Sequence, residues 1–282
     1  MKKITRRSFM AAAGLTVAAL ALTACGGSSS TASSAAASSV ASSAAASSEA
    51  ASAAATELTT VEAGKLTMAT NAAFPPYEMT TDAGEFEGID IETAQAIADK
   101  LGLELQIDDM DFDAALLSVQ QGKADIVMAG VTVTDERKAV MDFSDSYATG
   151  IQSIIVPEGS DITSPDDLAG KKIGTQRGTT GYIYCSDDFG DDAVVAYDDG
   201  LTAVQALKNG QVDAVVIDNA PAKEFVAANP GLVILDTSYA EEDYAIGLAK
   251  GSALEDAVNA ALEELKADGT LQSIVDKYIT AE

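Results

Sequence analysis

Apolar and polar residues alternate with two different periods beyond about residue 60. Short apolar runs over 66–70 and 124–128 have the length of buried strands, whereas apolar residues over 91–101 recur at helical spacing. Gly102 follows this helical pattern and predicts the end of the helix. Strand-like and helix-like segments that alternate in this way are typical of βα units. They predict an α/β fold built on mostly parallel sheets.

Two series of elements are predicted, one on each side of about residue 150. In the first series we expect strands over 66–70, 103–107 and 124–128, with helices over 91–101 and 113–121. In the second we expect strands over 151–156, 172–175, 193–197, 212–217, 233–235 and 244–249, with helices from about 180 and over 201–209, 221–228, 252–267 and 271–278. These elements predict two α/β lobes of comparable size.

Residues 1–24 carry the pattern of an export signal. Basic residues from Lys2 to Arg7 precede an apolar run over 9–22, and small residues follow. The run is shorter than the roughly 20 apolar residues that a helix needs to cross a bilayer, so we expect a signal peptide instead of a permanent span. The segment TRRSFM at 5–10 also resembles the twin-arginine signature, and both general and twin-arginine export stay open.

The end of this signal resembles a bacterial lipobox, with the sequence LTAC at 22–25. The resemblance implies cleavage before Cys25 and attachment of lipid to its sulfur. A core cysteine after an ordinary signal peptide is the alternative. Cys185 is the one other cysteine of the chain, so a lipidated Cys25 leaves no intramolecular disulfide.

Residues 25–60 separate the signal from the folded part of the chain. Ser, Ala, Gly and Thr make up almost all of 26–56, and Glu49 is the one charged residue there. Such a segment cannot bury enough apolar area to offset its conformational entropy, so we expect a disordered tether. A random coil of about 35 residues spans roughly 30 to 35 Å. That reach lets a lipid-anchored domain approach a membrane partner.

Charge and composition exclude several classes of function. The formal net charge is −27, and binding to nucleic acid needs a basic surface that this chain lacks. There is no histidine, which rules out His-based catalytic triads and His-containing zinc sites. We therefore expect no nucleic-acid partner, no metal and no cofactor, and hydrolases and metalloenzymes are disfavoured classes of function.

Arg137 is the first candidate for ligand chemistry. It follows a predicted buried strand and the glycine and threonine residues Gly130 and Thr132. A guanidinium at this point can bind a carboxylate through two hydrogen bonds, while backbone N–H groups and the Thr132 hydroxyl supply others. An exposed arginine paired with Asp135 is the alternative.

Two further polar candidates come from the second series of elements. The segment QRGTTG at 176–181 lies between a strand and a helix, where backbone N–H groups face anions, although an ordinary turn fits as well. Asp218 follows the predicted strand over 212–217, and open α/β sheets bind ligands at this end of a strand. It can accept hydrogen bonds from an ammonium group, or only cap the next helix.

Aromatic residues follow two strands of the first series. Phe74 lies in the segment FPPYE at 74–78, and Phe112 follows the strand over 103–107. Side chains at two such loops can pack on both sides of an aliphatic ligand, whereas core packing is the alternative for each.

Taken in order, several segments resemble the solute-binding proteins of polar amino-acid ABC transporters. They are TNAAFPPYE at 70–78, GIDI at 88–91, GKADI at 122–126, AGVTVTDERK at 129–138 and DFS at 142–144. The resemblance implies a type II periplasmic-binding-protein fold with two crossovers, near 147–151 and 240–244. It places 65–148 with 243–282 in one lobe and 149–242 in the other.

The resemblance also implies roles for individual residues. The α-carboxylate of a free amino acid would be bound by Arg137 with Gly130, Thr132 and Thr179, and its ammonium group by Asp218. The full set of expected ligand-binding positions is Asn71, Phe74, Tyr77, Phe112, Ala129, Gly130, Thr132, Arg137, Gln176, Thr179, Thr180 and Asp218.

Three residues depart from the family pattern. Asn71 stands where several relatives carry Asp, Gln176 stands where some carry Lys, and Arg177 is unusual in its loop. A buried cationic side chain needs a compensating carboxylate, so a neutral Asn71 favours a neutral polar ligand such as glutamine or cystine. Glu78 or Glu85 can still supply that carboxylate, so a cationic ligand stays possible.

The resemblance implies a monomeric, extracytoplasmic protein that is anchored to the outer face of the cell membrane by its lipid. Its expected partners are a free L-amino acid and the permease of an ABC importer. Two alternatives are an enzyme on the same fold, with Glu78 as its candidate acid or base, and a sensory module that hands its ligand to a separate signalling partner.

Overall fold

The computed structural model describes residues 58–279, all of which belong to one compact unit of the chain. The predicted signal peptide over 1–24, Cys25 and nearly all of the tether over 25–60 lie outside the described residues. The description below therefore concerns the folded part alone.

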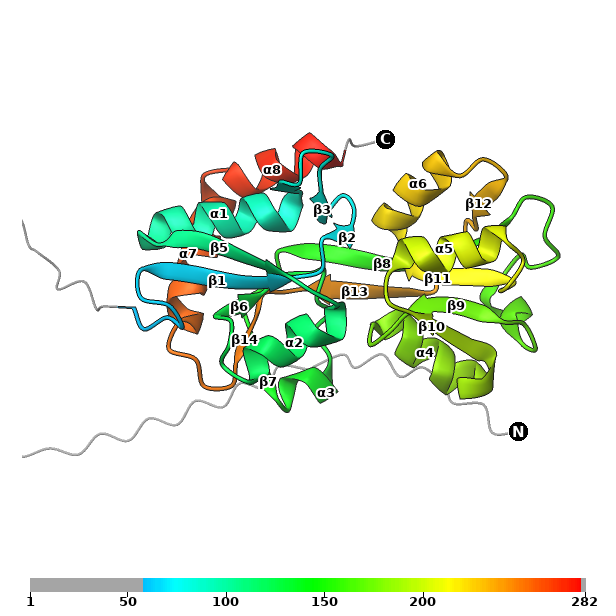
Figure 1. The fold of residues 1–282 in the computed structure, drawn as a ribbon, viewed down its shortest axis with the longest axis horizontal. Helices are drawn as coiled ribbons and strands as arrows, with labels where there is room; N and C mark the ends of the chain where they lie inside the picture. The colour runs from blue at the N-terminus through cyan, green and yellow to red at the C-terminus, as the bar shows by residue number, and fades with distance from the viewer. Residues whose placement is uncertain (1–57, 280–282) are drawn as a thin grey trace, which may run out of the picture. The chain divides into compact units, whose positions relative to one another are not determined.

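The first lobe is built on a five-stranded sheet. Its order is β5 (Glu104–Asp109), β1 (Lys65–Thr70), β6 (Ile126–Val127), β14 (Gly247–Ala249) and β7 (Met141–Phe143). Leu66 and Met68 of β1 pack with α1 (Ile89–Leu101), α7 (Glu255–Ala267) and α8 (Thr270–Tyr278), whereas Ala69 packs with α2 (Phe112–Gln120). Helices thus cover both faces of the sheet, which is why β1 is buried along nearly its whole length (Figure 1).

The second lobe is built on a six-stranded sheet. Its order is β10 (Val194–Tyr197), β9 (Ile173–Gln176), β11 (Ala214–Asp218), β8 (Ala148–Pro157) and β12 (Leu232–Ile234), and β13 (Ala240–Tyr244) also pairs with β8. One face packs on α5 (Gly200–Lys208) and α6 (Asn219–Ala228), and the other on α4 (Thr180–Phe189). Short 3-10 helices at Pro165–Leu168 and Asp191–Ala193 complete this lobe.

The two lobes are connected by neighbouring antiparallel strands. β8 and β13 pair from Ala148↔Tyr244 to Gln152↔Ala240, and Figure 1 shows both of them running from the first lobe into the second. A small sheet of β2 (Ala73–Phe74), β3 (Glu78–Thr80) and β4 (Phe86–Glu87) lies in the first lobe. The short helix α3 (Asp135–Lys138) lies between β6 and β7.

Most predicted elements are confirmed within a few residues of their expected bounds. The helix expected to end at Gly102 does so, because Gly102 adopts the left-handed conformation (φ 69°) that closes α1. The expectation of mostly parallel sheets is wrong, since β8 and β14 run antiparallel to the strands beside them. The single strand expected over 244–249 is also wrong: Tyr244 ends β13 in one sheet, and Gly247 begins β14 in the other.

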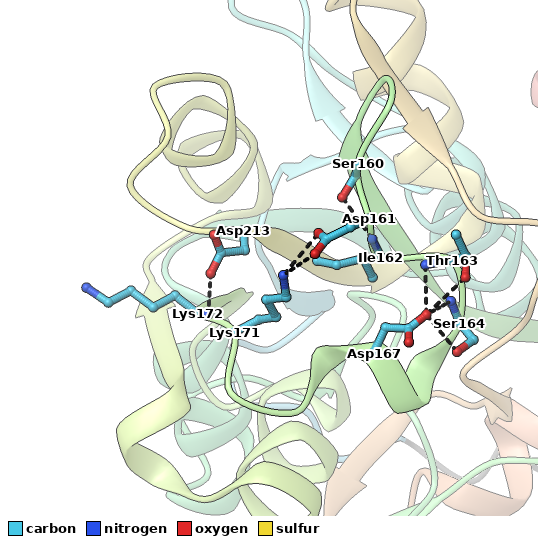
Figure 2. Close-up of polar contacts among 9 residues, drawn as sticks. All are labelled: Ser160, Asp161, Ile162, Thr163, Ser164, Asp167, Lys171, Lys172 and Asp213. Atoms are coloured by element: carbon cyan, nitrogen blue, oxygen red, sulfur yellow. Dashed lines mark hydrogen bonds and ion pairs between the residues drawn. The ribbon is translucent and has the colours of Figure 1, made fainter.

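The loop between β8 and β9 is ordered by carboxylates of its own sequence. Asp167 Oδ2 accepts hydrogen bonds from the N–H and hydroxyl groups of Thr163 and Ser164, each at 3.0 Å. Figure 2 shows this cluster beside a second one, in which Lys171 binds Asp161. These contacts fix the chain directly before β9, the strand whose end carries Gln176.

We expect Asp167→Ala to lower the melting temperature, because four donors lose their common acceptor. Hydrogen bonds from Thr163 and Ser164 hold the pKa of Asp167 below its ordinary value. A lowered pKa means that this contribution is present above about pH 4 and is lost as the pH falls further. Thermal unfolding at several pH values measures it, with the exposed neighbour Asp166→Ala as control. Equal melting temperatures for the two variants at neutral pH would contradict the assignment.

Candidate functional site

A cavity of about 450 Å³, counted with the part that opens to solvent, lies between the two lobes. It is formed where strands of both sheets end, which is where open α/β sheets bind ligands. Every predicted ligand-binding position except Tyr77 lines it. The lining residues are Asn71, Phe74, Glu78, Phe112, Ala129, Gly130, Thr132, Arg137, Gln152, Gln176, Thr179, Thr180, Val216, Ile217, Asp218 and Tyr244.

Tyr77 lies behind this lining. Its ring stacks on Phe74 with centroids 5.9 Å apart and meets the ring of Tyr244 edge-on at 5.4 Å. Tyr77 is buried among apolar residues of the first lobe. Its role in the structure is to support two aromatic residues that do line the cavity.

Arg137 is a buried cation on the first-lobe side of the cavity. Its guanidinium donates to the carbonyl of Thr132 at 2.7 Å and to that of Gly178 at 3.1 Å, and it lies 5.4 Å from the centre of the Phe112 ring. Among residues 58–279 no carboxylate lies within ion-pair distance of it, so the alternative of a surface pair with Asp135 is wrong. Burial lowers the pKa of Arg137.

A guanidinium has five N–H donors, and two carbonyls do not satisfy all of them. Thr134 caps α3 by accepting the backbone N–H of Arg137 at 3.2 Å, which fixes where this side chain begins. Arg137 is therefore a preorganised cation whose natural complement is a carboxylate.

Asp218 is the buried anion on the second-lobe side. Its Oδ1 accepts the N–H of Ala220 at 3.1 Å and its Oδ2 accepts the N–H of Ile151 at 2.7 Å. The first contact caps α6, so the capping alternative describes part of its role, although the same side chain also lines the cavity. Burial raises the pKa of Asp218 to about 6, and hydrogen bonds from Tyr244, Ala220 and Ile151 limit the rise.

Contacts across the cavity join the two lobes. Arg137 of the first lobe donates a hydrogen bond to the carbonyl of Gly178 in the second lobe. Gln176 Nε2 of the second lobe donates to Asn71 Oδ1 of the first lobe at 2.8 Å. Two of the departures from the family pattern, Asn71 and Gln176, are therefore hydrogen-bond partners of each other. The third, Arg177, does not line the cavity and lies 3.7 Å from Asp198 at the surface.

Glu242 is a buried carboxylate that sequence reasoning missed. Its Oε2 accepts the hydroxyls of Thr132 at 3.1 Å and Thr180 at 2.9 Å, and the amide of Gln152 at 3.0 Å. The Thr132 hydroxyl is thus directed to Glu242, and the same residue lines the cavity. Glu242 lies in the segment AEED at 240–243, and such a run of charges is typical of a solvated surface.

Other lining residues were missed for different reasons. Tyr244 and Gln152 come from the two connecting strands, whose pairing is not visible in either segment alone. Val216 and Ile217 look like ordinary core residues of a buried strand. Glu78 was considered only as a possible partner of a cationic ligand or as an acid or base, and it lines the cavity with 0% of its surface exposed.

Thr179 and Thr180 begin α4 at the edge of the cavity. The Thr179 hydroxyl accepts the N–H of Tyr182 at 3.3 Å and donates to the carbonyl of Gln176 at 2.8 Å. The start of α4 therefore lies at the cavity, since both threonines line it.

Within residues 58–279, no group of side chains is suited to hold a metal ion, and no helix combines the length and the apolar character that a bilayer crossing requires. Cys185 is a buried free thiol in the core of the second lobe, away from the cavity.

The sequence profile of the bacterial extracellular solute-binding proteins of family 3 matches residues 66–281. The chain belongs to this family. Family members are binding proteins for transported solutes, which agrees with a cavity that contains a buried cation and a buried anion. The type II periplasmic-binding-protein fold expected from the sequence is confirmed by solved structures of the family.

Three similar proteins show the range of ligands in the family. The L-cystine-binding protein TcyJ of Escherichia coli strain K12 is 34% identical over 226 residues, which cover 78% of this chain and 85% of TcyJ. The arginine-, lysine-, histidine-binding protein ArtJ of Geobacillus stearothermophilus superimposes with a TM-score of 0.74 at 34% identity, covering 77% of this chain and 96% of ArtJ. An ancestral arginine-binding protein bound to glutamine has a TM-score of 0.74 and 42% identity, covering 77% and 99%.

We expect Gly150→Ala to destabilise the connection between the lobes. A Cβ atom at this position of β8 would lie 2.5 Å from Cζ of Tyr244 and 2.7 Å from Oδ2 of Asp218. Overpacking of this kind costs about 1–3 kcal/mol. Chemical denaturation measures the loss, and the exposed neighbour Thr149→Ala is the control. If the free energy of unfolding equals that of the unsubstituted protein, the prediction is wrong, because the Tyr244 side chain can then move aside without loss of stability.

Proposed function

We propose that this protein captures a free L-amino acid between its lobes and delivers it to the permease of an ABC importer. The observation that carries this proposal is a buried guanidinium without a carboxylate partner, Arg137, across the cavity from a buried carboxylate, Asp218. A free amino acid presents a carboxylate and an ammonium group on one carbon atom. The relatives described above bind cystine, arginine, lysine, histidine or glutamine, all of which share that arrangement.

In this proposal the α-carboxylate binds the free N–H donors of Arg137, together with backbone N–H groups around Thr132 and Thr179, because the N–H of Gly130 is already donated to Asp90. Charge-assisted bonds of this kind are roughly twice as strong as neutral ones. The ammonium group binds Asp218, whose pKa of about 6 leaves it largely ionised at neutral pH. Phe74 and Phe112 line the cavity and pack against the aliphatic part of the ligand.

The side-chain end of the site favours a neutral polar ligand such as glutamine or cystine, and a cationic ligand remains an alternative. Asn71 is neutral, and its amide bonds to Gln176 and to the carbonyl of Met110. A cationic side chain would need a carboxylate there. Glu78 is the carboxyl group of the cavity lining that lies on the small sheet of the first lobe.

Ligand binding stabilises the closed arrangement because the ligand contacts both lobes at once. Arg137 and Phe112 come from the first lobe, and Asp218 and Thr179 from the second. A ligand shifts a conformational equilibrium by its difference in affinity for the two states. We propose that residues 65–148 and 243–282 together form one moving part and that residues 149–242 form the other. We also propose that the protein works as a monomer.

We also propose that the protein is a lipoprotein on the outer face of the cell membrane. The basic residues, apolar run and LTAC sequence before Gly26 support a lipidated Cys25, and the Ser- and Ala-rich segment that follows supports a tether. The family itself is extracellular, which agrees with this location.

Arg137→Ala should raise the dissociation constant for the amino acid at least about thirtyfold, since loss of one partner of a buried charge pair costs about 2–5 kcal/mol. Calorimetric titration with L-glutamine, L-cystine and L-arginine identifies the ligand and measures the loss. Arg177→Ala is the matched control, because Arg177 is exposed and outside the cavity. Retained affinity in Arg137→Ala would disprove the assignment, and no binding of any free amino acid by the unsubstituted protein would disprove the proposed function.

Cys25→Ala should release the exported protein from the membrane, because no thiol remains for lipid attachment. Partition of the protein between detergent and aqueous phases measures the loss of the lipid. Fractionation of whole cells measures how much of the protein stays with the membrane. Cys185→Ala is the control, since Cys185 is buried in the second lobe. Membrane association that survives Cys25→Ala would show that the protein is held there by other means.

A further inference from the structure

Two carboxyl groups are buried side by side at the first-lobe end of the cavity. Glu78 on β3 and Asp90 in the first turn of α1 are both 0% exposed. Neither oxygen of Glu78 has an N–H or O–H donor among the described residues, and the same holds for Oδ1 of Asp90. The N–H of Asp90 donates to the carbonyl of Tyr77 at 2.8 Å, so the two side chains start from neighbouring segments, and a hydrogen bond between them is one cause of the pKa shift of each. Two carboxyl groups can form such a bond only if one of them carries a proton.

The hydrogen bonds of the second oxygen of Asp90 indicate that Asp90, and not Glu78, is the ionised group. Oδ2 accepts the N–H of Gly130 at 3.0 Å and the hydroxyl of Tyr147 at 2.8 Å. These donors stabilise the ionised form of Asp90, whereas Glu78 has no comparable donor among the residues that the structure describes. The same bonds connect Asp90 to the cavity lining through Gly130 and to the start of β8 through Tyr147.

The groups that act on this pair from the surrounding elements are acidic or phenolic. Asp109 at the end of β5 acts on Glu78, and Tyr77 and Tyr147 interact with both carboxyl groups. Asp218 and Tyr244 lie beyond Tyr77, and the cavity's cation, Arg137, interacts with Glu242, Tyr184, Tyr244 and Asp113. The surroundings therefore disfavour a second negative charge next to Asp90.

The electrostatics agree with the geometry. Burial raises the pKa of Glu78 well above its ordinary value, and the charges of Asp90 and Asp109 raise it further. Burial also raises the pKa of Asp90, to about 6, but the donors from Gly130 and Tyr147 oppose the rise. The shared proton therefore belongs to Glu78.

We propose that Glu78 holds a proton which it donates to Asp90, and that its other oxygen accepts a hydrogen bond from the ligand side chain. The second half of this inference rests on the proposed amino-acid function. A neutral amide, such as that of L-glutamine, bonds to this oxygen and leaves the proton in place. A guanidinium or ammonium group binds the ionised form of Glu78, and the displaced proton passes to the buffer. Glu78 thus determines specificity, because its protonation state depends on the charge of the ligand side chain.

The first experiment needs no ligand and compares the melting temperatures of the unsubstituted protein and Glu78→Gln across the pH range. The folded-state pKa of Glu78 is raised, so its stabilising contribution is complete below the unfolded value of about 4.3 and is lost as the pH rises toward the folded value. The amide introduced by Glu78→Gln has no proton to lose, and its NH₂ group still donates to Asp90. The melting temperature of Glu78→Gln relative to the unsubstituted protein should therefore increase from about pH 4 to about pH 8.

Glu87→Gln on the adjacent strand β4 is the matched control, because Glu87 is exposed. It makes the same chemical change without a buried proton, and its difference from the unsubstituted protein should stay flat over that range. A flat or decreasing difference for Glu78→Gln would overturn the assignment of the proton to Glu78.

The second experiment measures proton release during calorimetric titration with L-glutamine and L-arginine, in buffers of different ionisation enthalpy. We expect no proton release with glutamine and release of about one proton with arginine. The apparent affinity for arginine should therefore increase about tenfold for each unit by which the pH rises, as long as the pH is below the folded pKa of Glu78. Glu78→Gln should weaken arginine binding more than glutamine binding. Release with glutamine, or arginine binding without release, would overturn the specificity role. If neither amino acid binds, the proposed function fails while the melting experiment still decides where the proton lies.

Discussion

A buried guanidinium that finds only carbonyl partners constrains the whole region between the lobes. Arg137 donates to Thr132 in its own lobe and to Gly178 in the other, so the position of one charge depends on both lobes. The absence of a side chain at Gly178 lets the second lobe approach α2 of the first closely, because a Cβ atom there would lie 1.6 Å from Oδ1 of Asp113. The unused donors of Arg137 and the buried carboxylate of Asp218 make the cavity complementary to a ligand that carries both charges. Closure and recognition are therefore properties of the same contacts.

Three buried carboxyl groups in or near the cavity do not pair with this cation, and each has different partners. Asp218 is held by backbone N–H groups, Glu242 by hydroxyls from both lobes, and Asp90 by Gly130 and Tyr147. These bonds keep the carboxylates at fixed positions around the cavity and leave the guanidinium accessible. A direct ion pair would neutralise the charge that a ligand carboxylate needs. The strongly acidic chain thus preserves one buried positive site.

Local patterns in the sequence predicted the elements of both lobes, and together with the family resemblance they predicted eleven of the sixteen residues that line the cavity. Gly102 marked a helix end because left-handed backbone is a local property, and Arg137, Asp218 and Phe112 follow strands whose ends meet in an α/β fold. Glu242 escaped notice because its burial depends on the pairing of β13 with β8, which joins segments far apart in the chain. The Asn71–Gln176 bond escaped for the same reason, since the partners come from different lobes.

The paired connecting strands limit how the lobes can move. β8 and β13 are hydrogen-bonded from Ala148↔Tyr244 to Gln152↔Ala240, so they form a two-stranded ribbon instead of two independent tethers. A ribbon bends or twists more readily than its strands slide past each other, because sliding breaks every bond of the register. The ribbon therefore disfavours sliding of one lobe past the other and leaves bending and twisting as the motions open to the lobes. In the opening that we propose, the register of the ribbon is kept, so the lobes that carry Arg137 and Asp218 stay aligned along the strands.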